Sequence, residues 1–413
     1  MRADESDFAF ALLTPEAVRE RCHEIYNLAE TSKLDHFEVH MEYMNDAVEL
    51  VLKEIEVNYP NVKVPFHSRW RHFEFGRHNL WSELMERLPK VSKVENARRR
   101  FDLAIVSVLL DAGAGPDWRY NDKKTGIAQG RSEGLALASI RLLESGLLSL
   151  HGEDEPFRVD AEALRKLSTE KLGEVFQVSA VNPLLGLDNR TSLLNRLGSV
   201  LLKKPEMFCR DGTSRPGNLF DHLSKKQVGG TVEARDILIA LLRGIGHIWP
   251  DGEWLEDIPI GDVGHHSSLE RDDITNKLIP FHKLSQWMTY SLIEPLEEAG
   301  VTVINLDGLT GLPEYRNGGL FLDTKVLKTI NSKDLLSAHL LKSSLVVEWR
   351  ALTVALLDKL ADEVRFRTGD DAESLPLASV LQGGTWSAGR RIASQLREGG
   401  APPLKLHSSG TIF

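Results

Sequence analysis

Residues 309–319, with the sequence LTGLPEYRNGG, bring three different chemical groups into one short segment. Glu314, Tyr315 and Arg316 stand between a proline and two glycines. A carboxylate held there can stabilise a developing cation, while a phenol and a guanidinium can bind polar and anionic groups. The alternative is a surface ion pair between Arg316 and Glu314, which would contribute little to stability.

Residues 279–287, IPFHKLSQW, place His282 and Lys283 at the expected start of a helix. Backbone N–H groups at such an end favour an anion, so a lysine there opposes the helix dipole. We therefore predict that Lys283 meets a bound anion. The alternative is an exposed lysine without a function.

Residues 109–120, LLDAGAGPDWRY, follow an apolar helix with a carboxylate and a glycine-rich turn. The glycines would let the backbone approach a ligand closely, although the spacing matches no dinucleotide or phosphate loop. Asp111 and Asp117 are candidate acids, and Trp118 is a candidate pocket wall. The alternatives are a carboxylate that satisfies local backbone and a tryptophan that belongs to the core.

Residues 65–73, PFHSRWRHF, alternate basic and aromatic side chains. His67, Arg69 and Arg71 are candidates for contacts with an anion. The alternative is a turn anchored by two aromatic residues. Arginine over aromatic rings also suits single-stranded nucleic acid, but the formal net charge of −10 argues against a nucleic-acid partner.

Metal and cofactor chemistry find little support. The chain has no HExxH motif, and its cysteines are Cys22 and Cys209 alone. His265, His266 and Asp262, with His247, would form a metal site only if the fold gathered them, so loop histidines are the simpler interpretation. We expect no metal and no cofactor.

Composition describes an ordinary soluble globular chain. Of the 413 residues, 42% are hydrophobic and 27% are charged, and no apolar run is long enough to cross a bilayer. The acidic N-terminus lacks the apolar core of a signal peptide. We expect a cytoplasmic protein without a membrane partner, and its oligomeric state is not set by these patterns.

Helical periods dominate the chain, and strands are scarce. Thr14 and Pro15 form a helix start, and Gly300 is placed to end a later helix. Residues 301–304 are the best strand, with 319–322 as a candidate partner. The expected helices cover residues 15–29, 37–57, 96–110, 130–149, 160–171, 188–203, 231–248, 283–299, 332–367 and 386–397.

These patterns predict a mostly α protein with a few short strands. No internal repeat, low-complexity tract or clean linker divides the chain. We expect one large helical body and one compact domain over residues 1–413. Within it, residues 1–100 form an N-terminal helical part, 101–330 the catalytic core and 331–413 a C-terminal helical part.

Seven runs resemble a known family: PFHSRWRHF, LLDAGAGPDWRY, GRSEGLALAS, NPLLGLDNR, IPFHKLSQWMTYSLIEPLEEAG, LTGLPEYRNGGLFLD and GGTWSAGRRIA. They are similar to the uracil-catabolism protein four family, and the resemblance extends from about residue 10 to the terminal SSGTIF. That family belongs to the fungal and bacterial uracil degradation route through ribosylurea. Its name implies a pathway more than a reaction.

A second, distant resemblance bears on the reaction. PFHKLSQW followed by LPEYRNGG is similar to paired motifs of queuosine-salvage proteins, which are N-ribosyl hydrolases with a DNA-glycosylase-like, helix-hairpin-helix-type core. Lys283 falls on their lysine, Glu314 on their catalytic-loop aspartate, Tyr315 on their tyrosine and Arg316 on their arginine. Glutamate replaces aspartate here, and residues 317–319 depart from their Val-Pro-Gln, so the substrate pocket is not carried over.

Together the resemblances imply hydrolysis of the N-glycosidic bond of ribosylurea or its 5′-phosphate. Glu314 would stabilise an oxocarbenium-like transition state. Asp111, Asp117 and His282 are the candidate acids for the urea leaving group. The substrate would be a small ribosyl-ureido molecule.

The candidates for a 5′-phosphate are Lys283, Arg316 and Arg190, because cationic side chains bind phosphate oxygens. Two rival functions stay open. One is a metal-dependent amidohydrolase acting on a ureido carbonyl, and the other is a non-catalytic nucleotide-binding regulator that uses Arg69 and Arg71.

Overall fold

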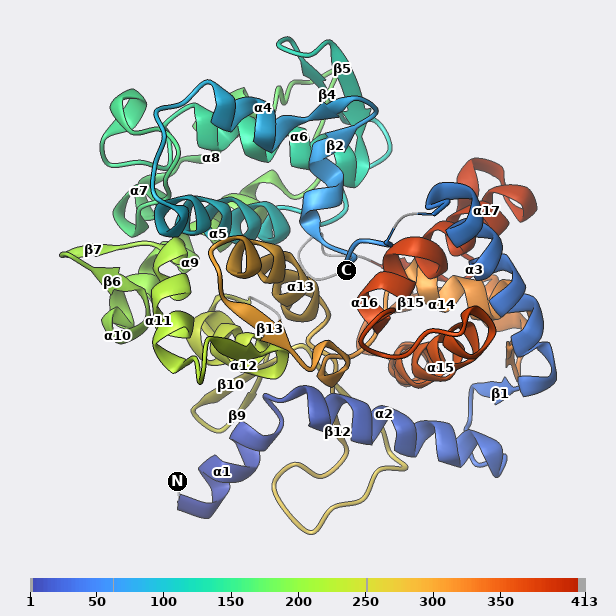
Figure 1. Ribbon diagram of the computed structural model, residues 1–413. Coiled ribbons are helices and arrows are strands. Elements are labelled where there is room, and N and C mark those ends of the chain that lie inside the picture. The colour runs from blue at the N-terminus through green and yellow to red at the C-terminus, as the bar shows by residue number, and fades with distance from the viewer. Residues whose placement is uncertain (1–2, 62, 250–251, 408–413) are drawn as a thin grey trace. The chain divides into compact units, whose positions relative to one another are not determined.

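The computed structural model describes residues 3–61, 63–249 and 252–407 and is mostly α-helical, which confirms the predicted fold class (Figure 1). Among the described residues every sheet has two strands. The described helices include none that is long and apolar enough to cross a membrane.

The contacts within the chain divide it into two compact units that are interleaved in sequence. The first unit contains the described residues of 3–67, 252–286 and 305–407, and the second contains 68–249 and 287–304. The predicted boundaries after residues 100 and 330 do not coincide with the edges of these units. The prediction of one compact domain stays a prediction.

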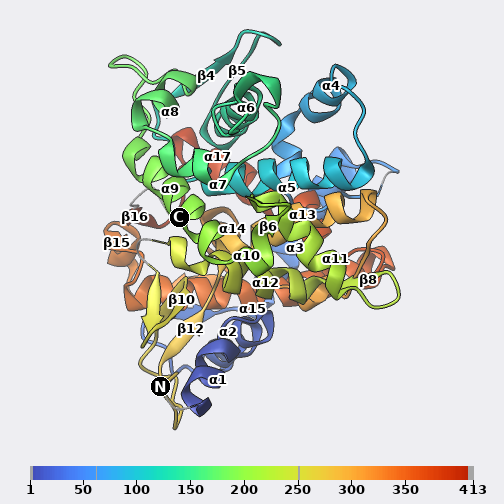
Figure 2. The same cartoon turned by 90° about the vertical axis from the view of Figure 1, so that its left-hand side faces the viewer.

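The first unit is built around α15 (Ser344–Thr368), against which α2 (Pro15–Glu30) packs (Figures 1 and 2). Residues 345–357 of α15 are all buried, as expected for a helix covered on every side. Thr14 caps α2 by accepting a hydrogen bond from the Ala17 N–H at 3.3 Å, which confirms the predicted helix start.

The other elements of the first unit are short helices and strands around this pair. They are α1 (Ala3–Ala11), β1 (Phe37–Val39), α3 (Met44–Asn58), β9 (Glu253–Leu255), β10 (Ile258–Gly261), β11 (Val263–His265), β12 (Leu278–Pro280), α14 (Tyr315–Asp323), β14 (Leu327–Thr329), β15 (Ala338–Leu340), α16 (Leu377–Val380), α17 (Trp386–Leu396) and β16 (Lys405–His407).

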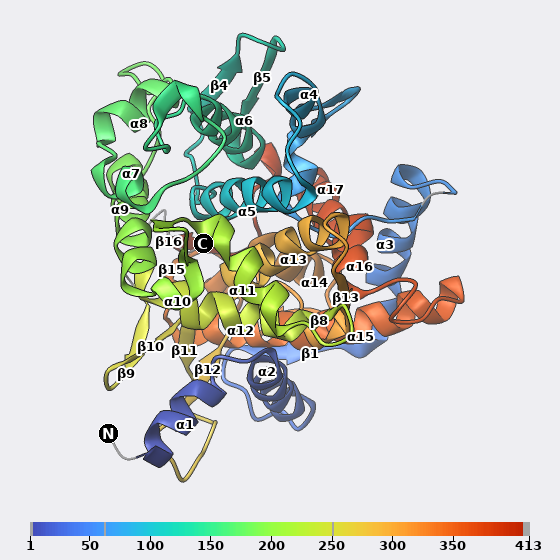
Figure 3. The ribbon, with the colours of Figure 1, turned by 60° about the vertical axis from the view of Figure 1, so that its left-hand side comes forward.

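The second unit has α5 (Lys93–Leu109) and α6 (Arg131–Glu144) in its core, with the β4–β5 hairpin beside α6 (Figure 3). Residues 100–109 of α5 are buried without interruption. The hairpin turns at Gly126, whose φ of +74° suits glycine. It leads directly into α6, so the hairpin sets where that helix starts.

Shorter elements complete the second unit. They are β2 (Glu74–Phe75), β3 (His78–Asn79), α4 (Leu80–Glu86), β4 (Arg119–Asp122), β5 (Ile127–Gly130), α7 (Ala161–Lys166), α8 (Thr169–Val175), α9 (Leu187–Lys203), α10 (Pro205–Phe208), β6 (Cys209–Arg210), β7 (Thr213–Ser214), α11 (Leu219–Lys226), β8 (Thr231–Glu233), α12 (Ala234–Ile245) and β13 (Thr302–Ile304). The division between the units falls within α13 (Lys283–Glu298).

Several predicted elements are wrong in detail. The strand at 301–304 is present as β13, but it pairs in parallel with β8, and its expected partner 319–322 lies in α14. The long helix begins at Ser344 rather than at 332, because β15 interrupts the run. Strand pairing with distant segments overrides local helical pattern in such places.

Three other helices start late or break. Residues 37–39 form β1, which pairs with β14, so α3 starts only at Met44. Residues 160–171 are split between α7 and α8, and residues 231–233 belong to β8. The stretch 249–268, for which the sequence pattern predicts no helix, contains β9, β10 and β11, while its residues 250–251 lie outside the described part.

Glycine allows α17 to pack closely on α14. A Cβ placed at Gly389 would lie 2.2 Å from the carbonyl oxygen of Arg316, and one at Gly318 would lie 2.7 Å from the ring of Trp349. Both contacts are shorter than any real Cβ contact, so these positions accept only glycine. The missing side chains therefore let α17 and the Trp349 ring approach the first turns of α14 closely.

We expect Gly389→Ala to lower the free energy of unfolding by about 1–3 kcal/mol, because the added methyl group meets a backbone carbonyl that cannot rotate away. Gly308→Ala is the matched control, since a Cβ there meets nothing within 4 Å. Urea denaturation of both variants tests this. Equal stability of the Gly389→Ala protein and the control would contradict the close contact.

Candidate functional site

Glu314 is the N-cap of α14, and its carboxylate is held by backbone donors. Oε1 accepts from the Asn317 N–H at 2.6 Å, and Oε2 accepts from the Arg316 N–H at 2.8 Å. Asn317 also donates from its side chain to the Leu312 carbonyl at 3.0 Å, which fixes the approach to the cap. Residues 315–317 form the first turn of this helix.

The charge on Glu314 is set by opposing effects. Burial raises the pKa of this carboxyl, and the N–H groups of Arg316 and Asn317 lower it in part. The cations of Lys283 and Arg316 also lower the pKa of Glu314. The Lys283 ammonium and the Glu314 carboxylate therefore interact electrostatically in the first unit.

Lys283 starts α13, and Asp262 holds that start. The Asp262 carboxylate accepts from the Lys283 N–H at 3.1 Å and from two nitrogens of Arg350 at 2.8 and 2.7 Å. Burial would raise the pKa of Asp262, but Arg350 and the capping N–H together hold it below its usual range. Sequence reasoning considered Asp262 only as a metal ligand, because a cap 21 residues away has no local signal.

His282 is buried directly before α13 with a φ of +48°. Its Nε2 faces the Leu12 carbonyl at 2.9 Å, so Nε2 must carry the proton, and its buried Nδ1 has no hydrogen-bond partner in the described chain. Burial lowers the pKa of His282. A neutral ring of this kind is a poor general acid at neutral pH, so the geometry argues against that predicted role.

Arg316 and Tyr315 lie on the first turn of α14. The buried Arg316 guanidinium donates to the Gly400 carbonyl at 2.9 Å and lies 4.8 Å from the Tyr315 ring centre. This contact ties α14 to the turn that precedes β16. Substrate binding by the two residues stays a prediction.

His67 is buried in the first unit. Its Nδ1 lies 3.0 Å from the Gln382 side-chain oxygen, and the Gln382 amide nitrogen donates to the Tyr59 hydroxyl. Gln382 thus presents an acceptor to His67, which places the proton on Nδ1. Burial lowers the pKa of His67 to about 4, so the ring is neutral at pH 7.

We expect His67 to make the protein less stable in acid. Between pH 6.5 and about pH 4 the unfolded ring, with a pKa near 6.5, is protonated, whereas the folded ring, with a pKa of about 4, is not. The free energy of unfolding therefore decreases as the pH falls through this range. At pH 5 the loss is about 2 kcal/mol relative to pH 7. Denaturation at both pH values should show a smaller loss for His67→Gln, and a slope equal to that of wild type would contradict this.

The second unit contains a buried polar cluster around Arg69. The guanidinium donates to Asp111 at 2.7 Å, to the Ser107 hydroxyl at 2.7 Å and to the Ser132 hydroxyl at 3.0 Å. Ser132 in turn lies 2.6 Å from both Asp111 oxygens. Burial raises the pKa of Asp111, and Arg69 and Ser132 lower it in part. Neither serine is among the residues predicted from the sequence, although Ser132 belongs to the GRSEG run at residues 130–134.

Three other predicted binding residues are placed differently. The buried Arg190 guanidinium donates to the carbonyls of Leu110, Ala112 and Gly113, among others. This favours a structural clamp over a phosphate site. Trp118 is fully buried and donates to the Phe176 carbonyl at 3.0 Å, as a core residue does, whereas Asp117 is exposed.

The candidate residues therefore fall into two groups. The first unit contains Glu314, Lys283, His282, Tyr315, Arg316 and His67, and the second contains Asp111, Asp117, Trp118, Arg69 and Arg190. Their roles in catalysis and binding stay predictions.

The histidines considered for a metal do not gather. His266 is buried with its Nε2 3.3 Å from Glu348, while His265 is exposed and Asp262 is paired with Arg350. His247 belongs to the second unit. Within the described residues no three His, Cys, Asp or Glu side chains are grouped as metal ligands would be.

The fold and the site together define a mostly helical protein with a helix-capping glutamate and a helix-starting lysine in one unit. The chain belongs to the family described as "Protein of unknown function (DUF1688)", whose model matches residues 11–413. It is 38% identical to the protein urg3 of Schizosaccharomyces pombe over 97% of this chain and 98% of that protein. It is 36% identical to uracil catabolism protein 4 of Lachancea kluyveri over 96% and 97% of the two chains.

Proposed function

We propose that this protein acts in uracil catabolism as an N-ribosyl hydrolase, which releases urea from ribosylurea or ribosylurea 5′-phosphate. The role in uracil catabolism is supported by the name of its Lachancea kluyveri relative, which is similar over nearly the full length. The reaction is supported by one observation above all, the half-buried Glu314 carboxylate that two backbone N–H groups hold in place and that interacts electrostatically with Lys283.

Breaking the bond from C1′ to the urea nitrogen builds positive charge on the ribose. A carboxylate beside C1′ stabilises this charge most effectively when it does not have to reorient. Glu314 meets that requirement because both oxygens are held by backbone N–H groups at 2.6 and 2.8 Å. Each oxygen keeps a lone pair with which it can face the sugar or take a proton from the attacking water.

The urea leaving group needs a proton or strong hydrogen bonds on its nitrogen or carbonyl. Burial lowers the pKa of His282, and its Nε2–H donates a hydrogen bond to the Leu12 carbonyl, so it is the weakest of the candidates. Burial raises the pKa of Asp111, and the hydrogen bonds that it accepts from Arg69 and Ser132 lower it only in part, so Asp111 stays a candidate acid. Asp117 is exposed and is the remaining candidate acid from the sequence.

Direct assay tests the proposal. Purified protein is incubated separately with ribosylurea and with its 5′-phosphate, and free urea and ammonia are both measured. We expect urea with at least one substrate and no ammonia. Ammonia in place of urea would indicate attack on the ureido carbonyl, and neither product would contradict a hydrolase acting on these substrates.

We expect Lys283→Ala to weaken binding of the phosphorylated substrate by about tenfold or more, because a charge-assisted hydrogen bond to phosphate is lost. Binding of unphosphorylated ribosylurea should change much less. The measurement is KM for urea release with each substrate, and Lys277→Ala, at an exposed lysine, is the control. Equal losses for both substrates would contradict the phosphate role.

A further inference from the structure

A pocket of about 560 Å³ lies in the second unit, outside all the residues considered above. Its walls come from the start of α5, the β6–β7 hairpin, α11 and the turn that follows α13. Arg98, Arg210 and Asp221 supply its charged groups, and no other ionisable side chain lines it. The volume is within the range of small-molecule sites.

Two guanidinium groups converge on one carboxylate in this pocket. Arg98 donates to the two oxygens of Asp221 at 2.8 and 2.7 Å, and Arg210 donates to one of the same oxygens. Burial would raise the pKa of Asp221, but the two arginines hold it below its usual range. Arg210 also pairs at 3.3 Å with Asp211, whose side chain is 90% exposed and does not line the pocket, so Asp221 is the carboxylate that faces both arginines inside it.

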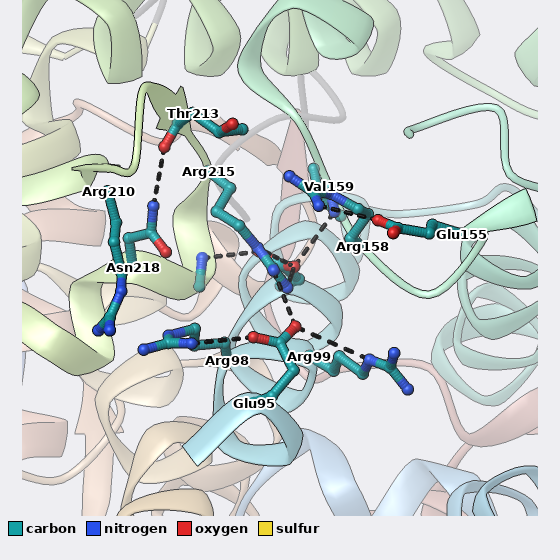
Figure 4. Close-up of polar contacts among 12 residues, drawn as sticks. Glu95, Arg98, Arg99, Glu155, Arg158, Val159, Arg210, Thr213, Arg215 and Asn218 are labelled. Carbon is teal, nitrogen blue, oxygen red and sulfur yellow. Dashed lines mark hydrogen bonds and ion pairs between the residues drawn. The ribbon is translucent and has the colours of Figure 1, made fainter. Parts of the chain in front are cut away.

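A second carboxylate, that of Glu95, also holds the Arg98 side chain. Its Nη1 pairs with Glu95 at 3.0 Å, and Glu95 is itself paired with Arg215 at 2.9 Å and approached by Arg99 at 3.8 Å (Figure 4). Figure 4 shows the guanidinium groups of Arg98 and Arg210 pointing to the same side of this network. Glu95 therefore shares its charge among Arg98, Arg99 and Arg215, and it fixes the Arg98 side chain.

Two hydroxyl groups of the pocket, those of Ser224 and Ser92, can donate hydrogen bonds to a ligand. The Ser224 hydroxyl is buried and has no hydrogen-bond partner in the described chain. The Ser92 oxygen accepts from the Glu95 N–H at 3.1 Å, which leaves its O–H to be donated. A buried hydroxyl without a partner costs free energy, and a ligand oxygen would satisfy it. Val94, Phe220 and Val301 add an apolar wall.

We propose that this pocket binds a small organic phosphate, with the phosphoryl oxygens between Arg98 and Arg210 and the carbon part against the apolar wall. A phosphate offers more acceptor oxygens than a carboxylate, and the arginine fork matches it. Ser224 and Ser92 donate to the same group. The site is separate from Glu314 and Lys283 and does not depend on the proposed reaction.

The test is calorimetric titration of the full chain with ribose 5-phosphate, inorganic phosphate and acetate at constant ionic strength. Arg210→Gln removes the half-exposed cation, and Arg165→Gln is its matched control, because the two side chains are 49% and 48% exposed. Ser224→Ala removes only an unpaired hydroxyl. Lys283→Ala serves to remove any phosphate bound at the proposed catalytic site.

We expect ribose 5-phosphate to bind more tightly than inorganic phosphate and acetate to bind hardly at all. Arg210→Gln should weaken phosphate binding by about tenfold or more, and Ser224→Ala should weaken it less. Arg165→Gln and Lys283→Ala should leave this binding within about twofold of wild type. Arg210→Gln is therefore also made in the Lys283→Ala protein, where phosphate cannot bind at the proposed catalytic site. Absence of binding to the Lys283→Ala protein, or binding that survives the added Arg210→Gln, would overturn the proposal. Urea release is assayed separately, so either proposal can fail alone.

Discussion

Replacing Glu314 by glutamine is expected to reduce kcat for urea release by roughly 10²–10³-fold, the cost of removing one preorganised electrostatic group from a transition state. The charge that would face the ribose cation disappears. The amide oxygen can still accept a backbone N–H, so KM should change little. The measurement is steady-state urea release by the purified variant at pH 7.

The pH profile gives this prediction a second readout. Burial raises the pKa of Glu314 above its usual value of 4.5, and only the charged form stabilises a cation. The wild-type rate should therefore fall as the pH drops through that raised pKa, and Glu314→Gln should lose this acidic limb. A merely structural cap would not produce such a limb.

A capping control separates stability from chemistry. Ser168 caps α8 by accepting from the Lys171 N–H at 3.3 Å, so Ser168→Ala removes a cap and should cost about 1 kcal/mol of stability. We expect that variant to keep wild-type turnover. Undiminished urea release by Glu314→Gln would refute the assignment of this residue.

Replacing Arg215 by methionine should lower the free energy of unfolding by roughly 3–5 kcal/mol, because a buried charge loses its partner. Arg215 pairs with the fully buried Asp102, whose carboxylate also accepts from the Gly217 N–H at 2.6 Å and the Val159 N–H at 3.1 Å. The same guanidinium reaches Glu95, as Figure 4 shows. Chemical denaturation measures the loss.

The pH dependence of this variant has a definite sign. Burial raises the pKa of Asp102, and Arg215 is the principal group that opposes this. Without Arg215 the folded carboxyl holds a proton that the unfolded one releases, so stability falls as the pH rises through the folded pKa. The loss caused by Arg215→Met should then be smaller at pH 5 than at pH 7.

The double variant Asp102→Asn/Arg215→Met removes the orphaned charge and should recover part of the lost stability. Arg165→Met, at a half-exposed arginine in a surface pair, is the control and should stay close to wild type. A single variant as stable as this control would contradict the buried pair.

The sequence by itself determined the helical class, most helix positions and the local geometry of the caps. Thr14 and Pro15 start α2, and Lys283 starts α13 as predicted, because these signals lie within one helical turn of the residues they position. The fold class was visible because apolar periodicity is a local property of the chain.

Only the tertiary structure decided which groups satisfy one another across long sequence separations. Asp262 caps α13 from 21 residues away, and Arg69 donates hydrogen bonds to Asp111 and Ser132. The Arg190 guanidinium donates to backbone carbonyls. No local pattern reports these pairings, since burial in a folded core forces each polar group to find whichever partner the packing brings near.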